Sequence, residues 1–147
     1  MLIVLDSNIL LRAVNRNDQF HIVTLEALRF FRSNNTAFCF FPQSAAEFWN
    51  VCTRPFSARG GLGLSIEETD RRMQILHRFA TAYPDVPAAY DLWRDLVRSH
   101  RITGVQVHDT RIVALMQAHG IRDILTFNSA DFSRFEHITV HSPHSLI

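Results

Sequence analysis

The stretch from Val107 to Phe132 constrains the fold more tightly than any other part of this chain. Its first half predicts an amphipathic helix that begins at Asp109. Three apolar residues follow Asp109 at the spacing of a single helical face. They are Ile112, Val113 and Met116. We therefore expect this face to pack on a core, with the carboxylate of Asp109 at the start of the helix.

The second half of the same stretch predicts a turn and a buried strand. Gly120 stands where glycine commonly ends a helix. The run Ile124–Phe127 is short, apolar and bounded by polar residues, as in strands that are covered on both faces. Asn128 and Asp131 follow this strand. A helix start and a strand end can thus hold two acidic groups side by side, fixed by packing.

Helices and short apolar strands also alternate along the rest of the chain. This alternation predicts an α/β fold of three layers, with a central, mostly parallel sheet flanked by helices. Residues 1–147 are expected to form a single domain of this kind. In a predicted helix over residues 20–32, the expected core-facing side chains are Ile22, Leu25, Leu28 and Phe31. The other strands are predicted at 2–5, 36–41 and 138–140, and the other helices at 8–14, from Ser44, from Ser65 and at 88–98.

Composition and charge narrow the class of protein. Hydrophobic residues make up 47% and charged residues 20% of the 147, which is typical of a folded globular chain. The formal net charge of +1 excludes a strong overall field, so any binding to nucleic acid has to be local. The sequence has no membrane-length apolar run and no signal-peptide pattern, so a cytoplasmic location is expected. Cys39 and Cys52 are expected to be buried apolar side chains rather than a disulfide.

Four acidic residues fall at predicted element ends that share one edge of the sheet. Asp6 ends the first strand, and Glu47 lies in the first turn of the helix after the second strand. Asp109 and Asp131 flank the third strand. Functional groups gather beyond the carboxyl ends of parallel strands, and four carboxylates repel one another unless cations neutralise them. Hard oxygen ligands select Mg²⁺ or Mn²⁺, so the pattern indicates a divalent-metal site suited to phosphodiester hydrolysis by a metal-activated water.

Each of these acids also has a structural interpretation. Asp6 could cap the next helix, and Asp109 could be the N-cap of its own. The spacing Ser44-x-x-Glu47 fits a capping box, in which the glutamate serves only the helix. Asp131 could cap the short turn that follows it. Taken together, these interpretations do not explain why every acid falls at the same predicted edge.

Four motifs make the sequence similar to a known family. They are L-I-V-L-D-S-N at residues 2–8, A-E-F-W at 46–49 with T-R-P at 53–55, V-H-D-T-R-I-V-A at 107–114, and I-L-T-F-N-S-A-D-F at 124–132. In this order and spacing they resemble the PIN-domain family, and within it the VapC-type toxins of bacterial toxin–antitoxin pairs. The resemblance implies an endoribonuclease that depends on Mg²⁺ or Mn²⁺, is inhibited by a cognate antitoxin protein and is usually a homodimer.

The resemblance also implies residue roles. Asp6, Glu47 and Asp109 match the family's three central acids. The fourth acid stands either directly after the strand, where this chain has Asn128, or three residues later, at Asp131. We favour Asp131 as the fourth metal ligand and catalytic acid, with Asn128 as a neutral ligand or substrate contact.

Further polar residues are expected around these acids. Ser7, Asn8 and Thr126 match positions that orient the metal ligands in the family. Arginines near the acidic edge are candidates to contact RNA phosphates. They are Arg54, Arg59, Arg101 and Arg111.

Two other kinds of α/β domain are excluded by residues at this edge. A receiver domain needs an acidic pair after the first strand and a lysine near the site, but the chain contains no lysine. A haloacid-dehalogenase phosphatase needs D-x-D, and here the second acid is replaced by Asn8. A PIN-like interaction module without nuclease activity stays open as the alternative. The sequence leaves open which RNA is cut and whether one or two cations bind.

Overall fold

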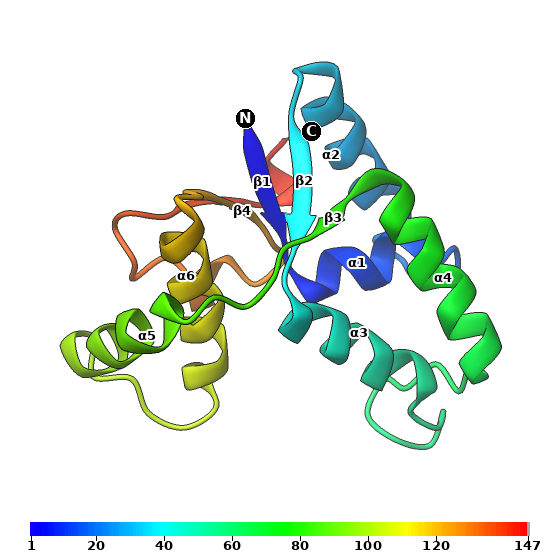
Figure 1. The fold of residues 1–147 in the computed structure, drawn as a ribbon. Coiled ribbons are helices and arrows are strands. Elements are labelled where there is room, and N and C mark those ends of the chain that lie inside the picture. Colours follow the sequence, from blue (N-terminus) through cyan, green and yellow to red (C-terminus); the bar gives the residue numbers. More distant parts are fainter. Residues whose placement is uncertain (147) are drawn as a thin grey trace.

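The computed structural model describes residues 1–146 and is organised around a five-stranded sheet with the strand order β3-β2-β1-β4-β5 (Figure 1). The strands are β1 (Leu2–Leu5), β2 (Ala37–Phe40), β3 (Thr81–Ala82), β4 (Asp123–Leu125) and β5 (Thr139–His141). The α-helices are α1 (Ser7–Val14), α2 (His21–Ser33), α3 (Pro42–Thr53), α4 (Ile66–Phe79), α5 (Ala88–Ser99) and α6 (Gln106–His119). Two short 3₁₀ helices are η1 (Ser129–Asp131) and η2 (Pro143–Ser145).

The central strand β1 is paired with β2 on one side and with β4 on the other. All the strand pairings in residues 1–146 are parallel, and in one of them Leu5 lies opposite Leu125. Because parallel neighbours end at the same edge, the residues that directly follow β1 and β4 are neighbours in space. These residues are Asp6 and Thr126. The predicted parallel sheet is therefore confirmed, and it brings the first two polar groups of the candidate site together.

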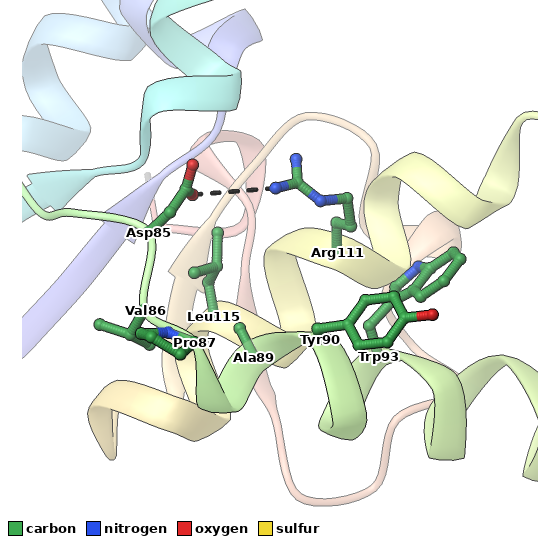
Figure 2. Close-up of a pocket in the computed structure, with 8 residues that line it drawn as sticks. All are labelled: Asp85, Val86, Pro87, Ala89, Tyr90, Trp93, Arg111 and Leu115. Carbon is green, nitrogen blue, oxygen red and sulfur yellow. Dashed lines mark ion pairs between the residues drawn. The ribbon is translucent and has the colours of Figure 1, made fainter.

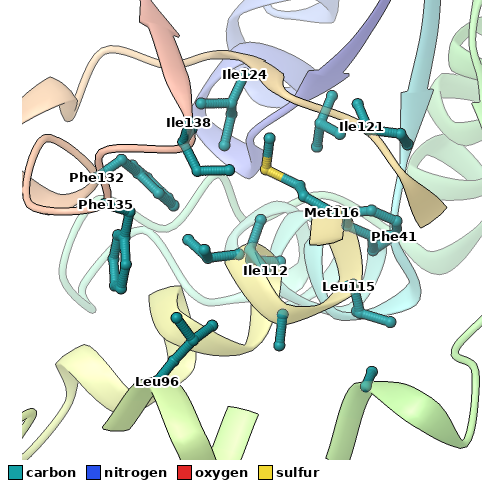
Figure 3. Packing of buried hydrophobic residues seen from close by; sticks show 14 of the residues in the cluster. Phe41, Leu96, Ile112, Leu115, Met116, Ile121, Ile124, Phe132, Phe135 and Ile138 are labelled. Carbon is teal, nitrogen blue, oxygen red and sulfur yellow. The ribbon is translucent and has the colours of Figure 1, made fainter. Parts of the chain in front are cut away.

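Successive side chains of β1 point to opposite faces of the sheet, so the core is divided into two layers, one on each face. Ile3 and Leu5 pack with α1 to α4, whereas Val4 packs with α5 and α6. Figure 3 shows this second layer, in which Met116 and Ile112 of α6 lie between β4 and α5. Helices thus cover both faces of the sheet, as the predicted three-layer architecture requires.

Helix α6 is more deeply buried than its sequence pattern predicts. It begins at Gln106 rather than at Asp109, and the whole run 112–116 is buried instead of one face. The reason is that α6 lies between the sheet and α5 and therefore contacts protein on two sides. Gly120 ends the helix with φ = 71°, as predicted, because a left-handed conformation suits glycine.

Helix α3 also begins earlier than predicted. It starts at Pro42 rather than at Ser44, because proline at the first helical position already has a helical φ and needs no N–H partner there. Ser44 is consequently buried inside the first turn, and no side chain caps this helix. The predicted capping box of Ser44 and Glu47 is therefore wrong, and Glu47 lies in the second turn.

Smaller differences concern surface exposure and short strands. Ile22 was expected in the core but is 63% exposed, because the inner face of α2 passes through Thr24 and Ala27 beside the predicted Leu28 and Phe31. Strand β3 was not predicted, since a strand of two residues has no detectable period. Cys39 and Cys52 are both fully buried and unpaired, as expected. No helix within residues 1–146 combines the length and the apolar character needed to cross a membrane.

Candidate active site at the carboxyl edge of the sheet

Asp6 is held in place by three hydrogen bonds at the carboxyl end of β1. Its carboxylate accepts from the backbone N–H of Ser7 at 2.8 Å, from the side-chain amide of Asn8 at 3.2 Å and from the hydroxyl of Thr126 at 2.7 Å. Asp6 is 94% buried, so these donors replace the water that the carboxylate would otherwise bind. It is also the N-cap of α1, as its structural interpretation predicted.

Asn8 and Thr126 join the ends of β1 and β4 into one network. The Asn8 amide donates to Thr126 Oγ1 at 3.1 Å, and Asn8 Oδ1 accepts from the backbone N–H of Phe127 at 3.1 Å. Thr126 Oγ1 also accepts from the backbone N–H of Asn128 at 3.0 Å. Every polar atom of these two side chains is thus engaged in fixing Asp6 or the chain that follows β4.

Burial and neighbouring charges act together on Asp6. Burial is the main cause that raises the pKa of Asp6, and the charges of Glu47 and Asp131 raise it further. The hydrogen bonds from Thr126 and Ser7 lower this pKa and so oppose the effect in part. Hydrogen bonds therefore hold the Asp6 carboxylate in one position, but burial and the neighbouring acids still make its negative charge unfavourable.

Asp109 lies in the first turn of α6 and faces the same edge. Burial raises the pKa of Asp109 to about 7, with further contributions from the charges of Asp6, Asp131 and Glu47. Within residues 1–146, no group donates a hydrogen bond to its carboxylate. It is not the N-cap of α6, because the helix begins three residues earlier. The charges of Asp6, Asp131 and Glu47 all act on Asp109, so the other three predicted acids lie within electrostatic reach of it.

Glu47 projects from α3 and has one hydrogen-bond donor, which the sequence analysis missed. Gln43, one turn earlier on α3, donates its side-chain amide to Glu47 Oε1 at 3.2 Å and to the backbone carbonyl of His108 at 2.8 Å. The Gln43 carbonyl accepts from Arg111 Nη1 at 2.8 Å. The spacing of four residues between Gln43 and Glu47 on a helix could have revealed the first contact. The other two contacts join residues far apart in the chain.

Asp131 and Asn128 occupy different surroundings after β4. Asp131 ends η1 and is partly buried, and its charge acts on both Asp6 and Asp109. Asn128 is exposed, and its backbone N–H rather than its side chain joins the network around Thr126. The charge of Asp131 therefore acts on the cluster, whereas the neutral Asn128 joins it through its backbone.

Of the four candidate arginines, only Arg111 is linked to an acid of the cluster by hydrogen bonds, through Gln43. Arg54 donates to the backbone carbonyl of Arg59 at 2.8 Å and so closes the loop between α3 and α4. Arg101 is exposed in the turn between α5 and α6, with φ = 53°. The structure thus brings Arg111 to the acidic edge and gives Arg54 a role within its own loop.

The family assignment follows from a comparison of the whole sequence. Residues 3–138 match the model of the PIN domain, and this match covers nearly the whole chain. The chain belongs to the PIN domain family. No protein of curated function matches the sequence.

Solved structures share the fold of this PIN domain. VapBC2 of Rickettsia felis, solved with a DNA fragment from its promoter, gives a TM-score of 0.71 at 15% identity and covers 97% of this chain and 98% of that one. VapBC-1 of nontypeable Haemophilus influenzae gives 0.69 at 13% identity, with 98% and 99% covered. VapC20 of Mycobacterium tuberculosis, a toxin described as cleaving the sarcin–ricin loop, gives 0.65 at 18% identity, with 90% and 95% covered.

A pocket of about 160 Å³ lies beside Arg111 on the side of this PIN domain formed by α5 and α6. In Figure 2, Arg111 extends toward Asp85, and the two side chains form an ion pair at 3.9 Å. Tyr90 and Trp93 form the opposite part of the pocket. The Trp93 indole N–H donates to the backbone carbonyl of Val107 at 2.9 Å, which fixes this wall against the start of α6.

The donor set of the acidic cluster suits a hard divalent cation. All four side chains offer carboxylate oxygens, and the pKa values of Asp6 and Asp109 are raised mainly by burial and further by the charges of the neighbouring acids. No group of three or more acidic, histidine or cysteine side chains in residues 1–146 is already arranged to surround one ion. A cation would therefore have to draw the other carboxylates closer to Asp6, whose own carboxylate is held by three hydrogen bonds.

Proposed function

We propose that this PIN domain is an endoribonuclease that depends on Mg²⁺ or Mn²⁺ and acts as the toxin of a toxin–antitoxin pair. One observation carries the proposal. At the carboxyl edge of the sheet, burial raises the pKa of Asp109 to about 7, and the charges of Asp6, Asp131 and Glu47 raise it further. A protein gains no stability from such repulsion, so a bound cation is the natural counter-charge.

Each acid has a distinct role in this proposal. Asp6 is the fixed ligand, since Thr126 and Ser7 hold its carboxylate before any ion binds. Asp109 has to lose a proton to bind, and Glu47 and Asp131 complete the oxygen set. When bound, the cation supplies positive charge for the scissile phosphate and acidifies a nearby water. The four side chains fix its position, and with it the position of the phosphate.

The proposed substrate is RNA, contacted locally. The near-neutral net charge leaves no general attraction for nucleic acid, so individual arginines must meet the phosphates. Arg111 is the best placed of the candidates, because it adjoins the acidic cluster through Gln43. The structural similarity to VapC20, a toxin described as cleaving the sarcin–ricin loop, supports this proposal.

The proposed partner is a cognate antitoxin protein. Several structural neighbours are toxin–antitoxin complexes. On this chain, Ile22 and Phe30 of α2 and Ile75 of α4 are large apolar side chains left exposed. Next to them a groove of about 170 Å³ is lined by Leu25, Leu28, Arg29, Arg32, Phe38 and Phe79. We propose that an amphipathic antitoxin segment covers this surface. We also propose that the toxin is a homodimer and that both proteins act in the cytoplasm.

Metal-dependent RNA cleavage by the purified chain tests the proposal. The wild-type protein, free of any partner, is incubated with total RNA in Mg²⁺, in Mn²⁺ or in EDTA. Asp6→Asn is compared with Asp70→Asn, which changes an exposed aspartate on α4 far from the cluster. We expect cleavage that requires metal, that is lost in Asp6→Asn and that is retained in Asp70→Asn.

Two results would contradict the proposal. Cleavage that persists in EDTA would exclude the metal-dependent mechanism. No cleavage of any RNA together with no Mn²⁺ binding in calorimetry would instead identify a PIN-like interaction module, in which the acids serve only the fold.

A further inference from the structure

Gln43 is the side chain that connects α3 to α6 next to the acidic cluster. It lies at the second position of α3, and its amide contacts His108 and Arg111, which are 65 and 68 residues away in the sequence. His108 directly precedes Asp109, and Glu47 follows Gln43 by one helical turn. One amide therefore touches the segments that hold two of the four acids.

The orientation of the Gln43 amide is determined by its partners. Both N–H groups are used, one toward Glu47 Oε1 at 3.2 Å and the other toward the carbonyl of His108 at 2.8 Å. The carbonyl oxygen accepts from Arg111 at 2.8 Å. A flipped amide would place its oxygen against a carboxylate and a carbonyl and its N–H groups against a guanidinium. The three contacts thus permit a single orientation.

Glu47 depends on this contact more than Asp6 depends on any one of its own. Asp6 accepts three hydrogen bonds from residues 7, 8 and 126, whereas Gln43 is the only donor to Glu47 within residues 1–146. A glutamate side chain has one more rotatable bond than an aspartate, so an unrestrained Glu47 would lose more entropy on binding an ion. Arg111 also forms a long ion pair with Asp85, at 3.9 Å between two half-exposed side chains.

We propose that Gln43 is a positioning residue, which holds Glu47 ready for the divalent cation and fixes the spacing of α3 and α6 at the active site. This inference rests on the proposed metal-dependent function. Side chains that orient a metal ligand typically change metal affinity or activity by tenfold or more when removed. Arg111 donates to the Gln43 carbonyl, and Asp85 forms an ion pair with Arg111. Both therefore act on Glu47 only through Gln43.

The test measures Mn²⁺ affinity and thermal stability separately. Gln43→Leu removes all three hydrogen bonds, and Gln43→Asn keeps an amide that is too short to reach Glu47 and His108 together. The matched control is Gln74→Leu on α4, because Gln74 donates to Asp70 four residues earlier at 2.9 Å in the same kind of pair on an exposed surface. Mn²⁺ dissociation constants come from calorimetry at pH 8, and melting temperatures are measured in EDTA.

We expect Gln43→Leu and Gln43→Asn to raise the Mn²⁺ dissociation constant by about tenfold. In RNA cleavage both should lower kcat more than they raise KM, because Gln43 orients a metal ligand and reaches RNA only through Arg111. Gln74→Leu should match the wild type. Arg111→Met should give an intermediate increase in the dissociation constant, since Gln43 keeps the two hydrogen bonds that it donates but loses the one that it accepts from Arg111.

The outcomes separate this inference from the function on which it rests. A wild type that binds no Mn²⁺ overturns the proposed function, and this inference with it. If the wild type binds and both Gln43 variants bind equally well, the proposed function stands and the positioning role is overturned. A lower melting temperature with unchanged affinity would assign Gln43 to helix packing alone. If Gln43→Leu does not fold, Gln43→Asn and Arg111→Met decide in the same way.

Discussion

Asp6 and Asp109 are both aspartates with a raised pKa at one edge of the sheet, but their surroundings differ. Asp6 receives three hydrogen bonds, all from residues that lie next to it in the chain or on the neighbouring strand. Asp109 receives none from the described residues, and burial near three other acids raises its pKa to about 7. The strand side of the site, formed by Asp6, Asn8 and Thr126, is thus prearranged by hydrogen bonds. The helix side, formed by Glu47 on α3 and Asp109 on α6, carries negative charge that the described residues leave uncompensated at Asp109.

The difference indicates that the two sides contribute to cation binding in different ways. A carboxylate that is already fixed loses little entropy when it becomes a ligand, and it defines where the ion binds. A carboxylate whose charge is unfavourable in the absence of the ion gains most when the ion arrives. Four changes test this division, and they follow in order of expected effect.

Asp109→Asn should have the largest effects, and they should have opposite signs. RNA cleavage is expected to fall by roughly a thousandfold, since a ligand charge worth several kcal/mol is lost. In EDTA at pH 8, however, the variant should melt at a higher temperature than the wild type. The pKa of Asp109 is raised in the folded protein, so its stabilising contribution is complete below the ordinary aspartate pKa of 3.8 and is lost as pH rises through about 7. Asparagine resembles the protonated form at every pH. A lower melting temperature of the variant at pH 8 would contradict this account.

Mn²⁺ affinity should rise with pH up to about 7 and then level off. Below that pH the ion has to displace the proton of Asp109, so the dissociation constant should change by about tenfold for each pH unit. Calorimetry between pH 5.5 and 8 measures this dependence. The same titration of Asp109→Asn should give weaker binding with a smaller pH dependence. Equal slopes for the two proteins would assign the proton to another group.

Asp131→Asn should reduce cleavage by about tenfold, and Asn128→Ala should reduce it less. The reason is that the charge of Asp131 acts on both Asp6 and Asp109, whereas the side chain of Asn128 is exposed. Cleavage rates at saturating Mn²⁺ compare the two variants directly. The reverse order would make Asn128 the fourth residue of the site.

Thr126→Val should mainly weaken the fold on the strand side. The change removes the donor to Asp6 and the acceptor for Asn8 and for the backbone of Asn128, at a residue that is fully buried. The free energy of unfolding should fall by about 1–3 kcal/mol, as for other buried polar groups that lose a partner. Thr139→Val on β5 is the control, because Thr139 is exposed on a strand. Equal unfolding free energies of the two variants in urea would argue against the network.

Local patterns were sufficient to predict the strand side of the site. A continuous apolar run that ends in Asp6 predicted β1, and the run before Asn128 predicted β4. Parallel strands end at the same edge, so the proximity of Asp6 to the end of β4 follows from those two predictions. However, β4 ends at Leu125 rather than at Phe127, so Thr126 and not Asn128 directly follows it. The roles assigned to Asp6, Asn8 and Thr126 as ligand and orienting residues stay predictions, although their side chains lie together as expected.

The helix side could not be predicted to the same depth. Sequence spacing allowed a capping box as the structural alternative for Glu47 and placed this residue in the first helical turn, but Pro42 began the helix earlier and buried Ser44. Ile22 fits a helical core face by its spacing, yet it is exposed because α2 lies against the sheet through other residues. Such choices depend on how a helix rotates against its neighbours, which propensity does not specify.

The sequence by itself determined the order of the elements, the parallel sheet and the presence of four acids at its carboxyl edge. Those features depend on hydrophobic period, on Gly120 and on polar residues at strand ends, all of which act over a few neighbouring positions. Only the tertiary structure decided that Gln43 would join Glu47 to α6 and that Asp109 would be buried without a donor. Both follow from the packing of α3 and α6 on the sheet, which brings together side chains more than 60 residues apart.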